Sequence, residues 1–215
     1  MTTSQPCSGP ASDRLPPPAR TYHHGDLPRV LLAAAEALVR ERGAPAFSLR
    51  ECARRAGVSH SAPGHHFGDV TGLLTAVAVR SFERLQAELR ATRQGDVAMA
   101  NFEALMRRYV TFAMTDPVLF RLMFHSDQVA CDDARLMAAG GAAYGELVAA
   151  VTAVNPHAGK DEATIRFSWA TIHGTAMLLI DGPLAPVGGR AEDVAALVEG
   201  MIRRIVHTVA TFGAS

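Results

Sequence analysis

The residues best suited to chemistry lie between Ser48 and Leu74, in the sequence SLRECARRAGVSHSAPGHHFGDVTGLL. Ser48 stands at the predicted start of a helix, where a hydroxyl group and free backbone N–H groups favour a phosphate. Arg50 can bind a phosphate, or the O6 and N7 atoms of guanine, through two hydrogen bonds. Histidines follow, and their ring nitrogens can donate or accept at base edges. These groups suit the binding of a polyanion.

Two short helices joined by a glycine turn must position these side chains. Ser48 and Glu51 form an S-x-x-E capping box, which predicts a helix that stops at Gly57. Ser59 is predicted to cap the next helix, and Ala53 is small enough for close helix contact. This layout is typical of a helix-turn-helix, whose second helix enters the major groove of DNA. An ordinary helical hairpin within a bundle is the alternative.

The charge distribution agrees with a polyanion partner for one part of the chain only. The chain carries 21 basic and 21 acidic residues and is neutral overall. Residues 1–80 hold nine Arg and six acidic residues, whereas residues 81–215 hold twelve basic and fifteen acidic ones. Five of the nine histidines also lie in the first part. A basic end on a neutral chain indicates that this end meets the polyanion.

Composition is that of an ordinary globular protein, with 48% hydrophobic and 20% charged residues among 215. No stretch approaches the roughly 18 consecutive apolar residues of a membrane span, so we expect no membrane association. The first residues lack a charged flank followed by an apolar core, which argues against a secretory signal. The three cysteines, Cys7, Cys52 and Cys131, are too few and too widely spaced for a disulfide framework. We therefore expect a reducing, cytoplasmic setting.

Helical periodicity dominates after a proline-rich start. Residues 1–22 contain five of the twelve prolines and predict a disordered tail. A first helix is predicted to end at Gly43, and a long one to begin at Asp69. Four more helices are predicted over roughly 97–115, 132–154, 161–180 and 191–211, with a short apolar link over 117–124. The predicted fold class is all-α.

At this point the sequence resembles the TetR family of transcriptional regulators. The first half carries the stronger resemblance, over about residues 22–90. The second half resembles the C-terminal domain type that is named for a Trp-His-Gly signature. The matching residues are Glu41-Arg42-Gly43, Phe47 to Glu51, Ala53, Ala56-Gly57-Val58-Ser59, His66-Phe67, Asp69, Leu73-Leu74, Asp116-Pro117, Phe120 to Phe124, Trp169 and His173-Gly174.

The resemblance implies an all-α homodimer that binds double-stranded operator DNA. It implies a tail over 1–22, a helix-turn-helix domain over 23–70, a connecting helix over 71–95, and an effector-binding and dimerisation domain over 96–215. A repressor that binds a palindromic operator and is released by a small molecule is the expected function. A helical ligand-binding or scaffold protein that has lost specific DNA binding is the alternative.

Matching the family's motif residue by residue gives the expected DNA contacts. The groove-facing positions fall on His60, Ser61, Ala62 and His65, where the Ala62 methyl group suits a thymine methyl. Backbone-contacting or border positions fall on Ser48, Arg50 and His66, and Ser59 and Gly64 complete the predicted set.

Two positions depart from the family's pattern. Gly64 stands where the family usually has Tyr, and Val70 stands where it usually has Lys. Both usual residues would contact phosphates, so three alternatives follow. DNA binding is weaker, or residues such as Arg29, Arg54 and the tail compensate, or binding has been lost.

The second half also carries a predicted effector pocket. Met and aromatic residues at helical spacing are the candidates, although core packing is the alternative for each of them. They are Met106, Tyr109, Phe112, Ala113, Phe120, Met123, Phe124, Trp169, His173 and Met177. We expect an effector that is mostly apolar or weakly cationic.

An apolar stripe on the last two helices is wider than one neighbour needs. It predicts that two helices of each chain pair with two of a partner. The predicted dimerisation residues are Ile172, Ala176, Ile180, Val194, Val198, Met201, Ile205 and Phe212.

Enzyme and metal functions find no support in the motifs. The chain lacks a G-x-S-x-G sequence, a P-loop and a zincin motif, so we expect no catalytic residues and no cofactor. His23 and His24, like the histidines after Ser59, lack the helical i, i+4 pair of a zinc enzyme. A metal site near His23 and His24 is the minor alternative. Cys52 is expected to be a buried structural thiol.

Overall fold

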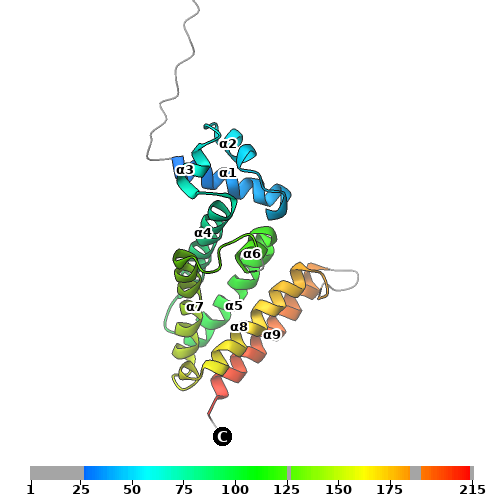
Figure 1. Cartoon of the computed structure of the whole chain (residues 1–215). Coiled ribbons are helices and arrows are strands. Elements are labelled where there is room, and N and C mark those ends of the chain that lie inside the picture. Colours follow the sequence, from blue (N-terminus) through cyan, green and yellow to red (C-terminus); the bar gives the residue numbers. More distant parts are fainter. Residues whose placement is uncertain (1–26, 125–126, 185–189, 214–215) are drawn as a thin grey trace, which may run out of the picture.

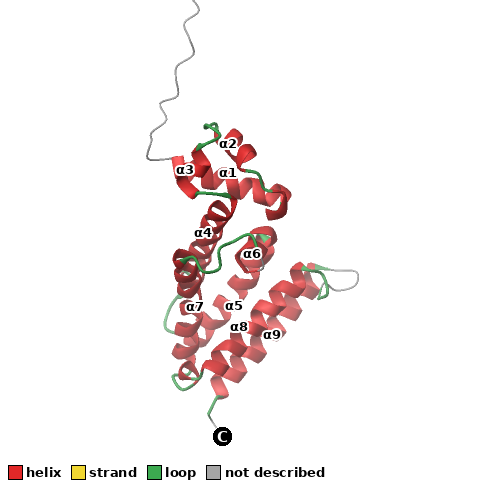
Figure 2. Ribbon diagram, in the orientation of Figure 1, coloured by secondary structure: helices red, strands yellow, loops and turns green. Residues whose placement is uncertain are grey.

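The structure is a computed structural model, and it describes residues 27–124, 127–184 and 190–213. Within these ranges every regular element is a helix, and no strand is found (Figure 2). The prediction of an all-α fold is confirmed. The predicted tail, together with Cys7, His23 and His24, lies outside the described residues.

The first three helices of the described chain form a small unit at one end of the molecule (Figure 1). They are α1 (Leu27–Arg42), α2 (Leu49–Ala56) and α3 (Ala62–Phe67). The interior of this unit contains Leu31 and Leu38 from α1 and Cys52 from α2, all fully buried. The 3-10 turn Ala44–Ala46 leads from α1 to α2.

A long helix, α4 (Val70–Arg90), runs from this unit into a larger helical part (Figure 1). It begins where predicted, since the Asp69 carboxylate accepts a hydrogen bond from the Gly72 N–H group at 2.8 Å. Leu73 and Leu74 at its start and Leu85 and Leu89 further along are buried. One helix therefore joins the two parts, whose buried residues form one continuous core.

In the described ranges, the larger part consists of five further helices, with a 3-10 turn at Ala158–Lys160. α7 packs along α4, and α5 packs between α7 and the neighbouring pair α8 and α9 (Figure 1). The helices are α5 (Ala98–Thr115), α6 (Pro117–Phe124), α7 (Ala134–Val154), α8 (Glu162–Ile180) and α9 (Ala191–Thr211).

Segment 117–124 differs from its prediction as a simple apolar link, because it forms α6. Asp116 precedes it and stabilises its first turn, where the carboxylate accepts from the Leu119 N–H at 3.4 Å. The carbonyl of Asp116 also accepts from the N–H of Phe120 at 2.9 Å. Asp116 thus caps the N-terminus of an apolar stretch that forms a helix.

Among the described residues, α7 alone is long and apolar enough to cross a membrane by length and composition, with a mean hydropathy of 1.3. Ala, Val and Leu residues contribute most of this value. In the structure α7 packs against α4, α5 and α8 as part of the helical bundle.

Candidate nucleic-acid interface and ligand pocket

The turn between α2 and α3 has the geometry that the sequence predicts. The Ser48 hydroxyl accepts from the Glu51 N–H at 3.5 Å, so Ser48 caps α2. Gly57 adopts the left-handed conformation, with φ 68 and ψ 33, and its N–H group bonds to the carbonyls of Ala53 and Arg54. This conformation is accessible to glycine at little cost and ends α2.

The start of α3 differs from its prediction. Ser61, and not Ser59, is the residue before the helix, and its side chain makes no capping bond. The Ser59 hydroxyl lies 3.3 Å from the Ser61 hydroxyl instead. Pro63 in the first turn has no N–H group, which removes one donor that a capping side chain would satisfy.

Most of the predicted DNA-contacting residues are exposed on one short segment. Ala62 is the exception, because it is only 7% exposed where α3 packs against α2 and α4. The expectation that its methyl group faces the groove is therefore wrong in this structure. The exposed residues are Ser59, His60, Ser61, Gly64, His65 and His66.

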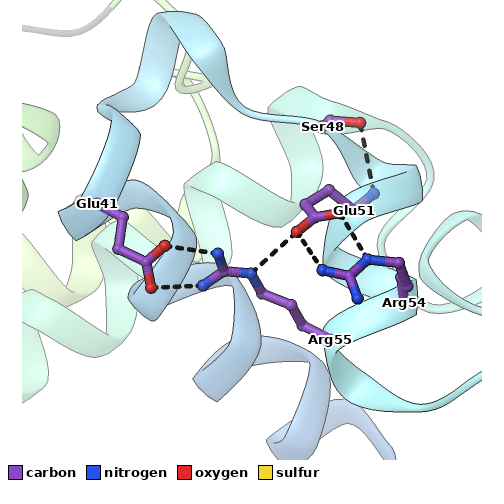
Figure 3. Close-up of polar contacts among 5 residues, drawn as sticks. All are labelled: Glu41, Ser48, Glu51, Arg54 and Arg55. Atoms are coloured by element: carbon purple, nitrogen blue, oxygen red, sulfur yellow. Dashed lines mark hydrogen bonds and ion pairs between the residues drawn. The ribbon is translucent and has the colours of Figure 1, made fainter.

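An ion-pair network braces α2 against the end of α1 (Figure 3). The guanidinium of Arg55 lies between two carboxylates, and it bonds to Glu41 at 2.6 Å and to Glu51 at 3.3 Å. Arg54 donates two hydrogen bonds of 2.8 Å to Glu51. Hydrogen bonding from Arg54 lowers the pKa of Glu51 to about 2. Glu51 therefore satisfies two arginines and does not complete the predicted capping box at Ser48.

This network distinguishes the three arginines of α2. The charges of Arg54 and Arg55 are offset by the two carboxylates. Arg50 is exposed and makes no ion pair within the part of the chain that the structure describes. The structure thus favours Arg50, and not Arg54, as the phosphate contact on α2.

The two departures from the family's pattern differ in their surroundings. A Cβ atom added at Gly64 would meet no atom within 4 Å, so the helix has room for a side chain there. Val70 is half-buried and packs against the core. Val70 thus has a packing role, whereas Gly64 leaves the surface bare.

A cavity of about 440 Å³ opens among α4, α5, α6, α7 and α8. Its size falls within the range of pockets that hold small molecules. Its wall is mostly apolar, with contributions from every one of these helices. The lining residues are Phe82, Leu85, Leu89, Leu105, Met106, Tyr109, Phe124, Gly140, Gly141, Ala143, Tyr144, Leu147, Arg166, Trp169 and Ile172.

A polar group is held inside the aromatic wall of this cavity. The hydroxyl of Tyr109 and Nδ1 of His173 form a hydrogen bond of 2.8 Å. The rings of Trp169 and His173 stack with their centroids 5.3 Å apart, and the Phe124 ring lies 4.7 Å from that of His173. Burial raises the pKa of Tyr109, although a hydrogen bond with Trp169 opposes the shift. The phenol thus stays protonated and fixes the imidazole behind the cavity.

Some of the residues predicted to bind an effector line this cavity, and others do not. Met106, Tyr109, Phe124 and Trp169 are among the lining residues. Six other candidates lie outside the lining: Phe112, Ala113, Phe120, Met123, His173 and Met177. Phe120 is fully buried behind the wall, and Met123 lines a smaller hollow of about 220 Å³ beside Cys131.

Other lining residues were missed for identifiable reasons. Phe82, Leu85 and Leu89 belong to an apolar stripe of α4 that any core helix would show. Gly140 and Gly141 could have indicated the pocket from the sequence, because two adjacent glycines within a helix leave space beside that helix. A Cβ atom at Gly141 would meet nothing within 4 Å.

α6 connects this pocket to the helix-turn-helix unit. Asp116, at its start, accepts a 2.7 Å hydrogen bond from Arg40 of α1. Arg40 also pairs with Glu36, as does Arg80 of α4. At the other end of α6, Phe124 lines the pocket. The segment from Asp116 to Phe124 therefore contacts both the helix-turn-helix unit and the pocket.

Four of the predicted dimerisation residues face the interior of their own chain. Ile172 is 2% exposed, Val198 is 8% exposed, and Ala176 and Ile205 are fully buried. Their assignment to a partner surface is therefore wrong in this structure, because α5, α8 and α9 already pack together there. Ile180, Val194 and Met201 are half-buried, and Phe212 is 36% exposed.

Comparison with known families separates the chain into the same two parts. Residues 31–77 match the family described as "Bacterial regulatory proteins, tetR family". Residues 102–205 match the family described as "Tetracyclin repressor-like, C-terminal domain". The chain belongs to the TetR family. Its helix-turn-helix is that of a DNA-binding transcriptional regulator, and the Trp-His-Gly subtype stays a prediction.

Solved structures of other proteins share the fold of this chain. A protein with unknown function from Rhodococcus sp. RHA1 is 37% identical, with a TM-score of 0.70, over 86% of this chain and 98% of that one. The TetR family transcriptional regulator PfmR from Thermus thermophilus is 20% identical, with a TM-score of 0.59, over 81% and 97%. A tetR-family transcriptional regulator from Streptomyces coelicolor is 21% identical, with a TM-score of 0.64, over 86% and 84%. The last two likenesses show the fold alone.

No curated protein matches the sequence. Within the described residues, no group of three or more His, Cys, Asp or Glu side chains could hold a metal ion. Membership of a family of regulators favours a regulatory function over an enzymatic one.

Proposed function

We propose that this TetR-family chain is a cytoplasmic repressor that binds a palindromic operator as a homodimer and leaves it when a small molecule binds. The proposal keeps the division of the chain into a DNA-binding unit up to residue 70, a connecting helix, and a sensor and dimerisation part from residue 96. One observation carries it. α4 starts three residues after α3 and, through Phe82, Leu85 and Leu89, also forms a wall of the pocket.

This shared helix gives a route from ligand to DNA. A ligand acts only through a difference in affinity between the DNA-bound and released states. Filling the cavity would displace α4, α6 or both, since each contributes to its wall. The ion pair between Arg40 and Asp116 ties α6 to α1, so the same displacement would turn the DNA-binding unit. The spacing of two recognition helices in a dimer would then no longer match the operator.

The dimer itself is proposed to form on the outer face of α8. Phe167 and Leu178 are 46% and 43% exposed there. Ala170, Thr171 and Gly174 lie between them at helical spacing, and a Cβ atom at Gly174 would meet nothing within 4 Å. Small residues between two large apolar ones allow a second helix to approach closely, and a lone chain would expose them.

A gel-shift experiment tests this function. Purified protein is mixed with the DNA upstream of its own gene and with shuffled DNA of the same composition. Preferential binding of the upstream DNA, lost on addition of a ligand that quenches Trp169 fluorescence, is the expected result. Equal binding of both DNAs would support the alternative of a helical scaffold that has lost its operator.

A further inference from the structure

Every polar side chain that lines the pocket can donate a hydrogen bond, and only the two tyrosine hydroxyl groups can also accept one. Among the described residues, four lining side chains carry N or O atoms: Tyr109, Tyr144, Arg166 and Trp169. Tyr109 is already engaged with His173 and Trp169. Arg166 and Tyr144 therefore remain to meet a ligand. A guanidinium only donates, and no carboxylate of the described residues lines the cavity.

Arg166 can exchange its present partner at low cost. It pairs with Glu162 one turn earlier on α8, through hydrogen bonds of 2.8 and 2.6 Å. The two side chains are 65% and 73% exposed, and ion pairs this exposed contribute little to stability. Glu162 itself is not part of the lining. Arg166 is therefore the member of this pair that lines the cavity, and its acidic partner does not.

The remainder of the cavity suits an uncharged body. Leu85, Leu89, Leu105 and Leu147 supply aliphatic surface from three helices. Gly141 leaves further space, since no atom lies within 4 Å of where its Cβ would be. Burial of apolar surface against such a wall contributes most of the affinity for a ligand of this type.

We propose that the pocket takes an amphipathic anion, with an apolar body among these leucines and a carboxylate on Arg166. This proposal rests on the proposed function, since it names the class of molecule that the sensor part detects. It replaces the expectation of a weakly cationic effector. A cation would lie beside Arg166 with no acidic lining residue, among those described, to balance it.

Three probes of equal chain length separate the head group from the body. Decanoate, decanol and decylamine are titrated into the full-length protein below their aggregation limits, with the fluorescence of Trp169 as the signal. Trp169 is the only tryptophan and lies in the cavity wall. Decanoate is expected to bind, and decylamine to bind worst.

The decisive variant is Arg166→Gln, which should weaken decanoate about tenfold, the value of one charge-assisted hydrogen bond. It should leave decanol unchanged. Arg135→Gln is the matched control, because Arg135 is 68% exposed, is paired with Asp133 and lies outside the cavity. Glu162→Gln removes the competing carboxylate and should not weaken decanoate. Circular dichroism checks the fold of each variant.

The outcomes distinguish this proposal from the proposed function. The proposal of an anionic head group is overturned if decanoate binds wild type and Arg166→Gln with equal affinity. It is also overturned if decanoate does not bind at all. Operator binding and release are scored separately by gel shift. The protein could fail to bind its upstream DNA and still prefer decanoate in a way that depends on Arg166. That result would contradict the proposed repressor function and support the proposed ligand class.

Discussion

Arg50 and Arg54 lie one turn apart on α2, yet only Arg54 is held in an ion pair with another described residue. Arg50 is exposed and has no ion-pair partner among the described residues. Arg54 holds Glu51 through two hydrogen bonds, so its charge is already offset. The residue types alone predicted that either arginine can contact DNA. The side-chain partners, which come from the packing of α1 on α2, separate them.

We predict that Arg50→Ala weakens operator binding by about 1–3 kcal/mol, the range for loss of a direct arginine contact to DNA. Arg54→Ala should weaken it less, since this guanidinium would first have to leave Glu51. Fluorescence anisotropy with labelled operator at one fixed salt concentration measures both. Equal losses in the two variants would mean that Arg54 changes partner when DNA binds.

The lowered pKa of Glu51 makes the DNA-binding unit sensitive to acid. Its pKa falls from an ordinary 4.5 to about 2 in the folded chain, chiefly through the hydrogen bond from Arg54. A group whose pKa is lowered by folding stabilises the fold above its unfolded pKa, and this stability is lost as pH falls through the folded value. The network should therefore weaken between about pH 4.5 and about pH 2.

We predict that Glu51→Gln makes thermal stability depend less on pH in this window. Melting followed by circular dichroism at several pH values gives the comparison with wild type. Glu83→Gln, an exposed carboxylate on α4 without an ion pair in the described part of the chain, is the control. Parallel curves for wild type and Glu51→Gln would show that the Arg54 pairing does not persist in solution.

At the scale of single helices, periodicity and glycines predicted most of the fold. α9 spans the residues expected of it, and α1 ends at the residue before Gly43, as expected. Two short helices were less predictable. The start of α3 depends on Pro63, and α6 depends on a cap by Asp116. In both helices the first residue is set by a single proline or capping side chain, and the spacing of apolar residues carries no information about it.

We predict that Gly64→Tyr tightens binding to operator and to unrelated DNA alike. Glycine within a helix costs about 1 kcal/mol relative to alanine, and the site has room for a side chain. A tyrosine hydroxyl would add a phosphate contact, which carries no sequence information. Gly64→Ala separates the two effects, because it restores helix propensity alone. Anisotropy with both DNAs measures the change, and weaker binding by Gly64→Tyr would place α3 too close to DNA for a side chain there.

At the scale of the molecule, the sequence indicated an excess of apolar surface on α8 and α9. It did not indicate which of these residues face the interior of the chain and which face a partner. Ile172, Ala176, Val198 and Ile205 face α5 and the chain's own interior, as burial shows. One wide stripe has to serve both an internal and an external neighbour, and only the packed chain divides it. The same holds for the pocket, whose wall combines residues from α4 to α8 that no single motif relates.

We predict that the wild-type chain has twice the mass of one chain in light scattering, and that Leu178→Glu reduces it to one. Leu178 is 43% exposed on the proposed dimer face, and a carboxylate buried there without a partner is costly. Met114→Glu is the matched control, since Met114 is 44% exposed but lies on α5. It should leave the mass unchanged. Because a repressor of two half-sites depends on the dimer, Leu178→Glu should also lose operator binding while its helical content stays that of wild type. A dimer that survives Leu178→Glu would place the interface on another face of the bundle.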